Sequence, residues 1–206
     1  MIKFVYFDVG GVLIKDFSET NKWAEMIGDM SIKPKDNDRF GEYFTKWEPV
    51  VCKGLELNSL LFKVSEEFGV TFSQNYDWMK DFVSRFERND TIWPVVQEIK
   101  LSAKVGLLTN MYPRMLDAIF EKGLLDGKWE VVIDSSLVSF KKPEKEFFDI
   151  AEKRAGVSAS EILFIENSKK HIDAAKKLGW RTFWYDSKNY NASSRKLLGF
   201  YNRWYL

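Results

Sequence analysis

The chain contains 206 residues, of which 45% are hydrophobic and 30% are charged. This balance predicts a globular protein with a substantial core, folded as one domain or as one domain with a sizeable insertion. The formal net charge of +1 gives no electrostatic reason to expect a nucleic acid or an anionic membrane as a partner.

The chain begins with a short apolar run. This run lacks the long apolar core of a signal peptide, and no apolar run in the sequence approaches ~18 residues, so we expect neither secretion by that route nor a membrane span. Residues 2–7 are almost continuously hydrophobic and are predicted to form a buried strand. The single cysteine, Cys52, excludes an intrachain disulfide and suits a reducing, cytoplasmic location.

Residues 16–89 show a different pattern, in which hydrophobic and aromatic side chains recur at helical spacing instead of alternating. Phe40, Tyr43, Phe44 and Trp47 form one such set. We expect about four helices here, and we expect their aromatic side chains to pack into a small core of their own.

From residue 90 onward, predicted helices and strands alternate. Helices are expected at residues 92–99, 114–122 and 144–155 and in a segment closed by Gly179, and strands at residues 104–108, 131–133, 162–165 and 181–185. Alternation of this kind predicts a parallel sheet with helices on both faces. The predicted fold class is therefore α/β, with a core made of residues 1–15 and 90–206 and a helical insertion at residues 16–89.

Polar residues directly follow several predicted strands, and parallel sheets bind ligands just beyond these carboxyl ends. The residues are Asp8, Thr109 with Asn110, and Glu166 with Asn167, and the strand at residues 131–133 leads through a loop to Lys142. A carboxylate, a hydroxyl, an ammonium and an acid–amide pair suit an anion held beside a divalent cation. Asp8 can bind Mg²⁺ and attack phosphorus, and the glycines at positions 10 and 11 let the backbone approach an anion or a metal.

Four segments, in this order, resemble the motifs of the haloacid dehalogenase (HAD) superfamily of hydrolases. They are FDVGGVL at residues 7–13, GLLTN at 106–110, KKPEKEFF at 141–148 and ILFIENSKKHIDAAKKLGW at 162–180. The resemblance covers nearly the whole chain. It implies a Rossmann-like parallel sheet core with a helical class I cap domain at residues 16–89. It also implies a Mg²⁺-dependent phosphatase that acts on a small phosphorylated metabolite through an aspartyl-phosphate intermediate.

The resemblance also implies a role for each matching residue. Asp8 takes the place of the nucleophile, and Thr109 and Lys142 are expected to act beside it at the phosphoryl group. Phosphate or substrate contacts are expected from Asn110, Gly10, Gly11 and Lys53, the last of these from a loop of the cap. Mg²⁺ is expected to be bound by Asp8, the Gly10 carbonyl, and Glu166 or Asn167.

Three positions depart from the family pattern. Gly10 stands where phosphatases of the superfamily usually carry a second aspartate, the general acid for the leaving group. Asn167 stands where a direct metal ligand is expected, and His171 where an Asn or Asp usually supports that site. Because a general acid contributes ~10²–10⁴-fold, we expect the site to favour good leaving groups, such as those of aryl, acyl or anomeric phosphates. Because Glu166-Asn167 replaces the usual aspartate pair, we expect Mg²⁺ to bind weakly.

Two other functions stay open. A non-catalytic binding module on the same fold would explain the missing general acid and the altered metal residues. A 2-haloacid dehalogenase would use the same Asp8 against carbon, and such enzymes also lack the second aspartate. Either a monomer or a homodimer is compatible with the sequence.

For several further residues, the sequence is compatible with two different roles. Tyr112 and Arg114 could contact substrate or could only begin a helix. Cys52 is expected to be a small buried hydrophobe and not a nucleophile. The aromatic C-terminal tail, residues 200–206, is expected to pack on the core.

Overall fold

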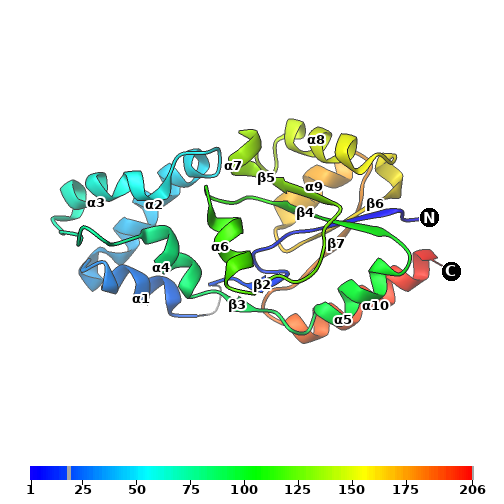
Figure 1. The fold of residues 1–206 in the computed structure, drawn as a ribbon, viewed down its shortest axis with the longest axis horizontal. Helices are drawn as coiled ribbons and strands as arrows, with labels where there is room; N and C mark the ends of the chain where they lie inside the picture. Colours follow the sequence, from blue (N-terminus) through cyan, green and yellow to red (C-terminus); the bar gives the residue numbers. More distant parts are fainter. Residues whose placement is uncertain (18–19, 206) are drawn as a thin grey trace.

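The computed structural model of the chain describes residues 1–17 and 20–205. Its central sheet has five parallel strands in the spatial order β5-β4-β1-β6-β7 (Figure 1). The strands are β1 (Phe4–Phe7), β4 (Lys104–Thr109), β5 (Val131–Asp134), β6 (Ile162–Glu166) and β7 (Arg181–Trp184). The predicted α/β sheet is confirmed, with strand ends that differ by at most two residues from those expected.

Strand β1 lies at the centre of the sheet because both of its faces are apolar. Val5 and Phe7 belong to one hydrophobic core, whereas Phe4 and Tyr6 belong to a second core on the opposite face. Phe7 is in register with its neighbours on β4 and β6. The residues that follow these three strands therefore meet at one edge of the sheet.

Helices cover both faces of the sheet (Figure 1). On one face lie α5 (Trp93–Lys100), α6 (Met115–Glu121) and α10 (Tyr190–Tyr205). On the other face lie α8 (Lys145–Ala155) and α9 (Lys169–Lys177). The short elements α7 (Ser135–Val138) and η3 (Ala159–Glu161), together with α10, are additions to the predicted set. None of the helices in the described part of the chain has the length and apolarity needed to cross a membrane.

Helix α10 accounts for the C-terminal tail. Tyr201 is 2% exposed, and its hydroxyl lies 2.8 Å from that of Ser102. The ring of Phe200 lies 5.4 Å from that of Phe183 on β7. The expected packing of the tail on the core is confirmed for these residues, whereas the side chains of residues 204–206 lie outside those described.

Four α-helices form most of the insertion, and they stand beyond one end of the sheet, at the left of Figure 1. They are α1 (Lys22–Asp29), α2 (Asn37–Val51), α3 (Leu61–Phe68) and α4 (Trp78–Ser84), joined by the 3₁₀ turns η1 (Pro34–Asp36) and η2 (Leu57–Leu60). The ring of Phe40 on α2 lies 5.8 Å from Trp23, 5.4 Å from Phe68 and 5.9 Å from Trp78. The predicted helices and their aromatic packing are both present.

A short antiparallel ribbon joins the insertion to the core. It pairs β2 (Ile14–Lys15) with β3 (Glu87–Arg88) at the two points where the chain passes between them. Strand β3 is therefore an addition to the four or so helices expected in residues 16–89. Strands of two residues leave no periodicity in the sequence, so the hydrophobic pattern does not reveal them.

Candidate active site

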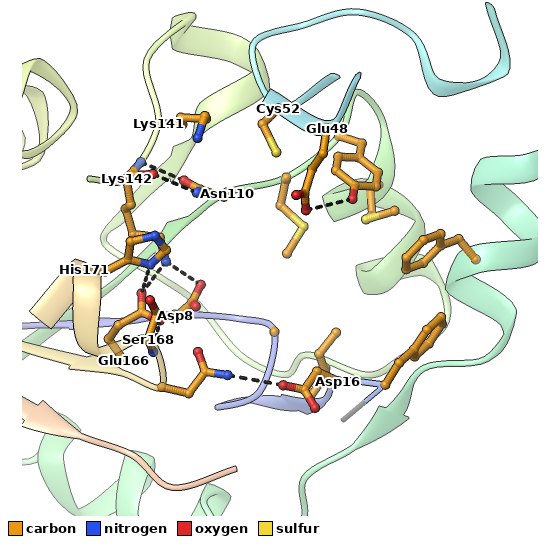
Figure 2. Close-up of a pocket in the computed structure, with 18 of the residues that line it drawn as sticks. Asp8, Asp16, Glu48, Cys52, Asn110, Lys141, Lys142, Glu166, Ser168 and His171 are labelled. Atoms are coloured by element: carbon orange, nitrogen blue, oxygen red, sulfur yellow. Dashed lines mark hydrogen bonds and ion pairs between the residues drawn. The ribbon is translucent and has the colours of Figure 1, made fainter. Parts of the chain in front are cut away.

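Side chains from three strand ends and one loop meet at the carboxyl edge of the sheet (Figure 2). Asp8 follows β1, Thr109 ends β4 and Glu166 ends β6, while Lys142 comes from the loop before α8. Each of these four residues is at most 8% exposed. The convergence predicted from the strand ends is present.

Lys142 forms two buried ion pairs. Its Nζ lies 2.8 Å from Oδ1 of Asp8 and 2.6 Å from Oε2 of Glu166. The Asn110 side chain accepts a hydrogen bond from the Lys142 N–H (2.8 Å) and donates one to its carbonyl (3.1 Å). Burial disfavours the ammonium, but the two carboxylates outweigh it and raise the pKa of Lys142, so the side chain stays charged. Asn110 thus fixes the backbone from which this cation extends.

Asp8 is oriented by its own backbone. The Asp8 N–H donates to the Ile165 carbonyl (2.9 Å), which extends the pairing of β1 with β6. Oδ1 accepts a hydrogen bond from the Val9 N–H (2.8 Å) and contacts Lys142, whereas Oδ2 takes no part in these contacts. Burial and the nearby Glu166 carboxylate raise the pKa of Asp8, and Lys142 opposes them.

Both oxygens of Glu166 are engaged. Oε1 accepts a hydrogen bond from the Ser168 N–H (2.9 Å), and Oε2 contacts Lys142. Burial opposes ionisation, but Lys142 and His171 lower the pKa of Glu166. The Nδ1 of His171 lies 3.2 Å from Oε2 without hydrogen-bond geometry. Burial lowers the pKa of His171, which keeps the imidazole neutral at pH 7.

Thr109 buries a hydroxyl that lacks a hydrogen bond to any of the described residues. The residue is 1% exposed, so solvent does not satisfy this group. Leaving a buried hydroxyl unpaired costs about 1–3 kcal/mol, and such groups in native proteins call for an explanation. An oxygen atom of a bound ligand is one group that would satisfy it.

The two glycines after Asp8 have different surroundings. Gly11 has φ of +75°, and an added Cβ would lie 2.0 Å from Nδ2 of Asn167 and 2.7 Å from Oδ2 of Asp16, so glycine is required there. Around Gly10, no heavy atom of the described residues lies within 4 Å of the position a Cβ would take. The position of the missing second aspartate is therefore open space.

Asp16 is a residue of this site that the strand-end rule misses. It follows the two-residue strand β2, and its Oδ2 accepts a hydrogen bond from Nδ2 of Asn167 (3.2 Å). This bond uses the amide nitrogen of Asn167 and leaves the amide oxygen on the other side of the group. The Asp16 carboxylate and the Asn167 amide oxygen are therefore two further polar groups of this site near Asp8.

A cavity of ≈ 570 Å³ opens over this edge of the sheet. Of the predicted site residues, its lining includes Asp8, Gly10, Asn110, Lys142, Glu166 and Asn167. Thr109 and Gly11 are not part of the lining among the residues described. Lys53 is also absent from this described lining, and its Nζ lies 2.7 Å from Glu144. The residues of the core that line the cavity therefore lie together, whereas the Lys53 side chain lies outside the described lining of that cavity.

Of the remaining candidate residues, some line the cavity and one lies at the protein surface. Tyr112 lines the cavity, and its hydroxyl donates to Oε1 of Glu48 at 3.4 Å. Arg114 instead pairs with Glu56 at 2.8 Å and is half exposed. Cys52 is 4% exposed, and burial, with a smaller effect of Glu48, raises the pKa of its thiol to about 12. The expectation that Cys52 is a buried hydrophobe is confirmed.

The donor set fits a hard divalent cation. Mg²⁺ binds oxygen ligands, commonly one or two carboxylates completed by water. Oδ2 of Asp8, the Gly10 carbonyl and the amide oxygen of Asn167 are oxygens of this kind at the cavity, whereas both oxygens of Glu166 are already engaged. Within the described residues, no three His, Cys, Asp or Glu side chains cluster as a metal site. A bound cation would therefore use backbone, amide and water oxygens beside Asp8.

Two curated relatives are phosphate-ester hydrolases. The GMP/IMP nucleotidase of Escherichia coli is 30% identical over 95 residues, which cover 46% of this chain and 42% of that protein. The match thus spans less than half of the nucleotidase. The sesquiterpene phosphatase of Aspergillus oryzae is 25% identical over 189 residues, which cover 86% of each protein.

Solved structures share the fold. A HAD family enzyme of Bacteroides thetaiotaomicron, in complex with magnesium and inorganic phosphate, has a TM-score of 0.73 at 20% identity, over 91% of this chain and 96% of that chain. The L-2-haloacid dehalogenase of Xanthobacter autotrophicus, with chloropropionic acid covalently bound, has a TM-score of 0.65 at 18% identity, over 90% and 78% of the two chains.

A family model also matches most of the sequence. The haloacid dehalogenase-like hydrolase model covers residues 2–179, a span that includes every residue described above at the edge of the sheet. The fold, the strand-end residues and this match agree with one another. The protein is a member of the haloacid dehalogenase-like hydrolases.

Proposed function

We propose that the protein is a Mg²⁺-dependent phosphatase that hydrolyses a small phosphomonoester through a phosphorylated Asp8. One observation carries this proposal: a buried Asp8–Lys142 pair lies at the same sheet edge as the unpaired hydroxyl of Thr109. The nucleophile, the cation and the hydroxyl donor that phosphoryl transfer needs are thus gathered in one place. The phosphatase activity of two relatives supports the same reaction class.

The reaction proceeds in two steps. An oxygen of Asp8 attacks phosphorus, the bond from phosphorus to the ester oxygen breaks, and the leaving oxygen takes up a proton from solvent water. Water then attacks the phosphorus of phospho-Asp8, and the bond from phosphorus to the Asp8 oxygen breaks. The protons of this water go to the released inorganic phosphate and to solvent, and the carboxylate is restored. Lys142 and the Thr109 hydroxyl contact the phosphoryl oxygens and stabilise their charge in both steps.

A divalent cation would be held by Asp8, the Gly10 carbonyl and Asn167. When bound, Mg²⁺ supplies positive charge that offsets the charge of the phosphoryl oxygens. Asn167 is placed for this by its bond to Asp16, and Glu166 fixes Lys142. Glu166 is therefore assigned as a positioning residue.

The leaving group determines the rate because no carboxyl occupies position 10. A leaving group with a low pKa departs without full protonation and misses the general acid least. Aryl and acyl phosphates are therefore expected to be better substrates than alkyl phosphates.

The test is phosphate release from p-nitrophenyl phosphate, acetyl phosphate, sugar phosphates and nucleoside monophosphates, each with Mg²⁺ and with EDTA. Asp8→Asn should reduce release at least about 10³-fold, whereas the exposed Asp173→Asn should leave it unchanged. Full activity in Asp8→Asn would contradict the mechanism.

The same preparation distinguishes the rival functions. Chloride release from 2-chloropropionate without phosphate release would identify a dehalogenase. Binding of phosphate esters without either reaction would identify a binding module. The proposal requires Mg²⁺-dependent phosphate release that disappears in Asp8→Asn.

A further inference from the structure

The insertion gives the cavity an aromatic wall. The aromatic wall comprises Phe17, Trp23, Phe44, Phe82, Phe86 and Tyr112, all of which line the cavity opposite the polar sheet edge. Phe17 comes from the residues after β2, Trp23 from α1, Phe44 from α2, Phe82 from α4 and Phe86 from the residues after α4, whereas Tyr112 follows β4 in the core. Separate segments of the insertion, joined by one residue of the core, thus contribute rings to one surface.

These rings contact one another and form a continuous surface. Phe82 stacks on Phe17 at 4.9 Å between ring centroids and meets Tyr112 at 5.9 Å. Phe44 contacts Trp23 at 5.4 Å and Tyr112 at 6.1 Å. Such a surface suits an apolar or planar group by burial and stacking.

The net charges on the two sides of the cavity are opposite in sign. From the core, three lysines line it, Lys141, Lys142 and Lys170, together with the two carboxylates of Asp8 and Glu166. The charged residues that the insertion contributes to the described lining are the carboxylates Asp16 and Glu48. A phosphoryl group is therefore attracted to the lysines of the core side, whereas a second anionic group on the leaving part would face the carboxylates of the insertion.

Glu48 lies among the apolar residues of the far wall (Figure 2). It follows Phe44 by one helical turn on α2, and the Tyr112 hydroxyl donates to it. Burial raises the pKa of Tyr112 well above its usual value, so the phenol stays neutral and offers no positive charge to an anion. The far wall is thus apolar with one negative site.

We infer that the natural substrate is the monophosphate ester of an uncharged, apolar alcohol or phenol whose body packs on the aromatic wall. This inference depends on the proposed function, because it assigns the substrate class of that same site. The volume of ≈ 570 Å³ is within the range of about 300–1,000 Å³ found for small-molecule sites. The open Gly10 position favours the phenols of this class, since a phenol departs without a general acid.

The inference is tested with four phosphates: 2-naphthyl, phenyl, 4-carboxyphenyl and acetyl phosphate. The first three have leaving groups of similar acidity and differ in apolar area and charge. We expect kcat/KM to rise about tenfold from phenyl to 2-naphthyl phosphate and to fall about tenfold from phenyl to 4-carboxyphenyl phosphate. Acetyl phosphate reports the phosphoryl site, because its leaving group, acetate, is small and has little apolar area to pack on the wall.

Two pairs of variants assign the effect to the wall. Phe82→Ala should lower kcat/KM for 2-naphthyl phosphate about tenfold and leave acetyl phosphate unchanged, whereas Phe62→Ala, at a side chain that is 69% exposed on α3, should change neither. Glu48→Gln should raise kcat/KM for 4-carboxyphenyl phosphate about fivefold, and the exposed Glu42→Gln on the same helix should not.

The outcomes separate this inference from the proposed function. Hydrolysis of acetyl phosphate with no preference for 2-naphthyl over 4-carboxyphenyl phosphate would overturn the inference and leave the phosphatase intact. Should no ester be hydrolysed, calorimetry on Asp8→Asn compares 2-naphthyl phosphate with inorganic phosphate. Tighter binding of 2-naphthyl phosphate than of inorganic phosphate would then support the inferred ligand class, although the proposed phosphatase activity would be contradicted. Equal binding of the two would overturn both the inferred ligand class and the proposed activity.

Discussion

Our proposal assigns to Gly10 the choice of leaving group. An ideal Cβ at this position meets no heavy atom of the described residues within 4 Å, so the backbone leaves room for the first side-chain atom of Gly10→Asp. The new carboxyl would supply the proton that an alkoxide needs. We expect the ratio of kcat/KM for ethyl phosphate to that for p-nitrophenyl phosphate to rise by ~10²-fold.

Gly10→Asn is the matched control, because it has nearly the same shape as Gly10→Asp but lacks an acidic proton. The ratio should be unchanged in this variant. An equal rise of this kcat/KM ratio in both variants would show that the effect is steric. It would contradict the claim that the missing general acid sets the leaving-group preference.

Burial lowers the chemical reactivity of the Cys52 thiol. A rise in thiol pKa from 9.0 to about 12 lowers the thiolate fraction at pH 8 by roughly 10³-fold, because each pKa unit is a factor of ten. We expect alkylation of the native protein by iodoacetamide at pH 8 to be slower by about this factor than alkylation in guanidinium chloride. The native rate should rise tenfold per pH unit up to pH 10, and comparable rates in both states would contradict the burial of Cys52.

At the scale of elements, the β2–β3 ribbon depends on Asn89. This residue is fully buried, and its side chain donates to the Val12 carbonyl (2.6 Å) and the Tyr185 hydroxyl (2.9 Å). It also accepts a hydrogen bond from the Thr91 hydroxyl (2.7 Å). One side chain thus connects the segment after β1, the segment after β3 and the segment after β7.

Asn89→Ala removes these three bonds, including the one to the Val12 carbonyl, whereas the Tyr185 hydroxyl keeps its bond to the Tyr190 carbonyl. We expect a loss of about 3 kcal/mol in the free energy of unfolding, measured by urea denaturation. The exposed Asn202→Ala on α10 should change stability by less than about 0.5 kcal/mol. A change below about 1 kcal/mol in Asn89→Ala would show that the ribbon is held in another way.

The sheet was predictable because its strands are buried on both faces and its polar residues fall where strands end. Asp8, Thr109 and Glu166 could be placed together by this rule alone, and Lys142 could be added because its loop follows β5. Helix α10 could have been found from Leu197 and Tyr201, which are spaced four residues apart and both buried, but its aromatic residues concealed the pattern.

The other half of the site was not predictable in the same way. Asp16 and Glu48 face the cavity because of how the insertion packs against the sheet edge, and no spacing in the sequence encodes that packing. The same holds for Lys53, whose partner Glu144 lies 91 positions further along the chain. Local patterns locate a strand end, but they do not show which face of a helix meets a cavity.

At the scale of the whole molecule, the two parts of the chain divide the work. In our proposal the core supplies the phosphoryl site, with Asp8, Thr109 and Lys142 at the carboxyl edge of the sheet. The insertion supplies the aromatic wall, apart from Tyr112, and the acidic residues that we propose face the rest of the substrate. Chemistry and selectivity are therefore expected to respond to different mutations, the first at the core and the second at the insertion.

The central claim is that phosphate passes through Asp8, and the most direct test is to trap that intermediate. The protein is mixed with acetyl phosphate and Mg²⁺, quenched in acid within milliseconds, reduced with borohydride, digested and analysed by mass spectrometry. Reduction converts an aspartyl phosphate to homoserine, so our account predicts this change at Asp8 and its absence from samples made with EDTA. Rapid phosphate release with an unmodified Asp8, or with the modification at another carboxylate, would contradict the account.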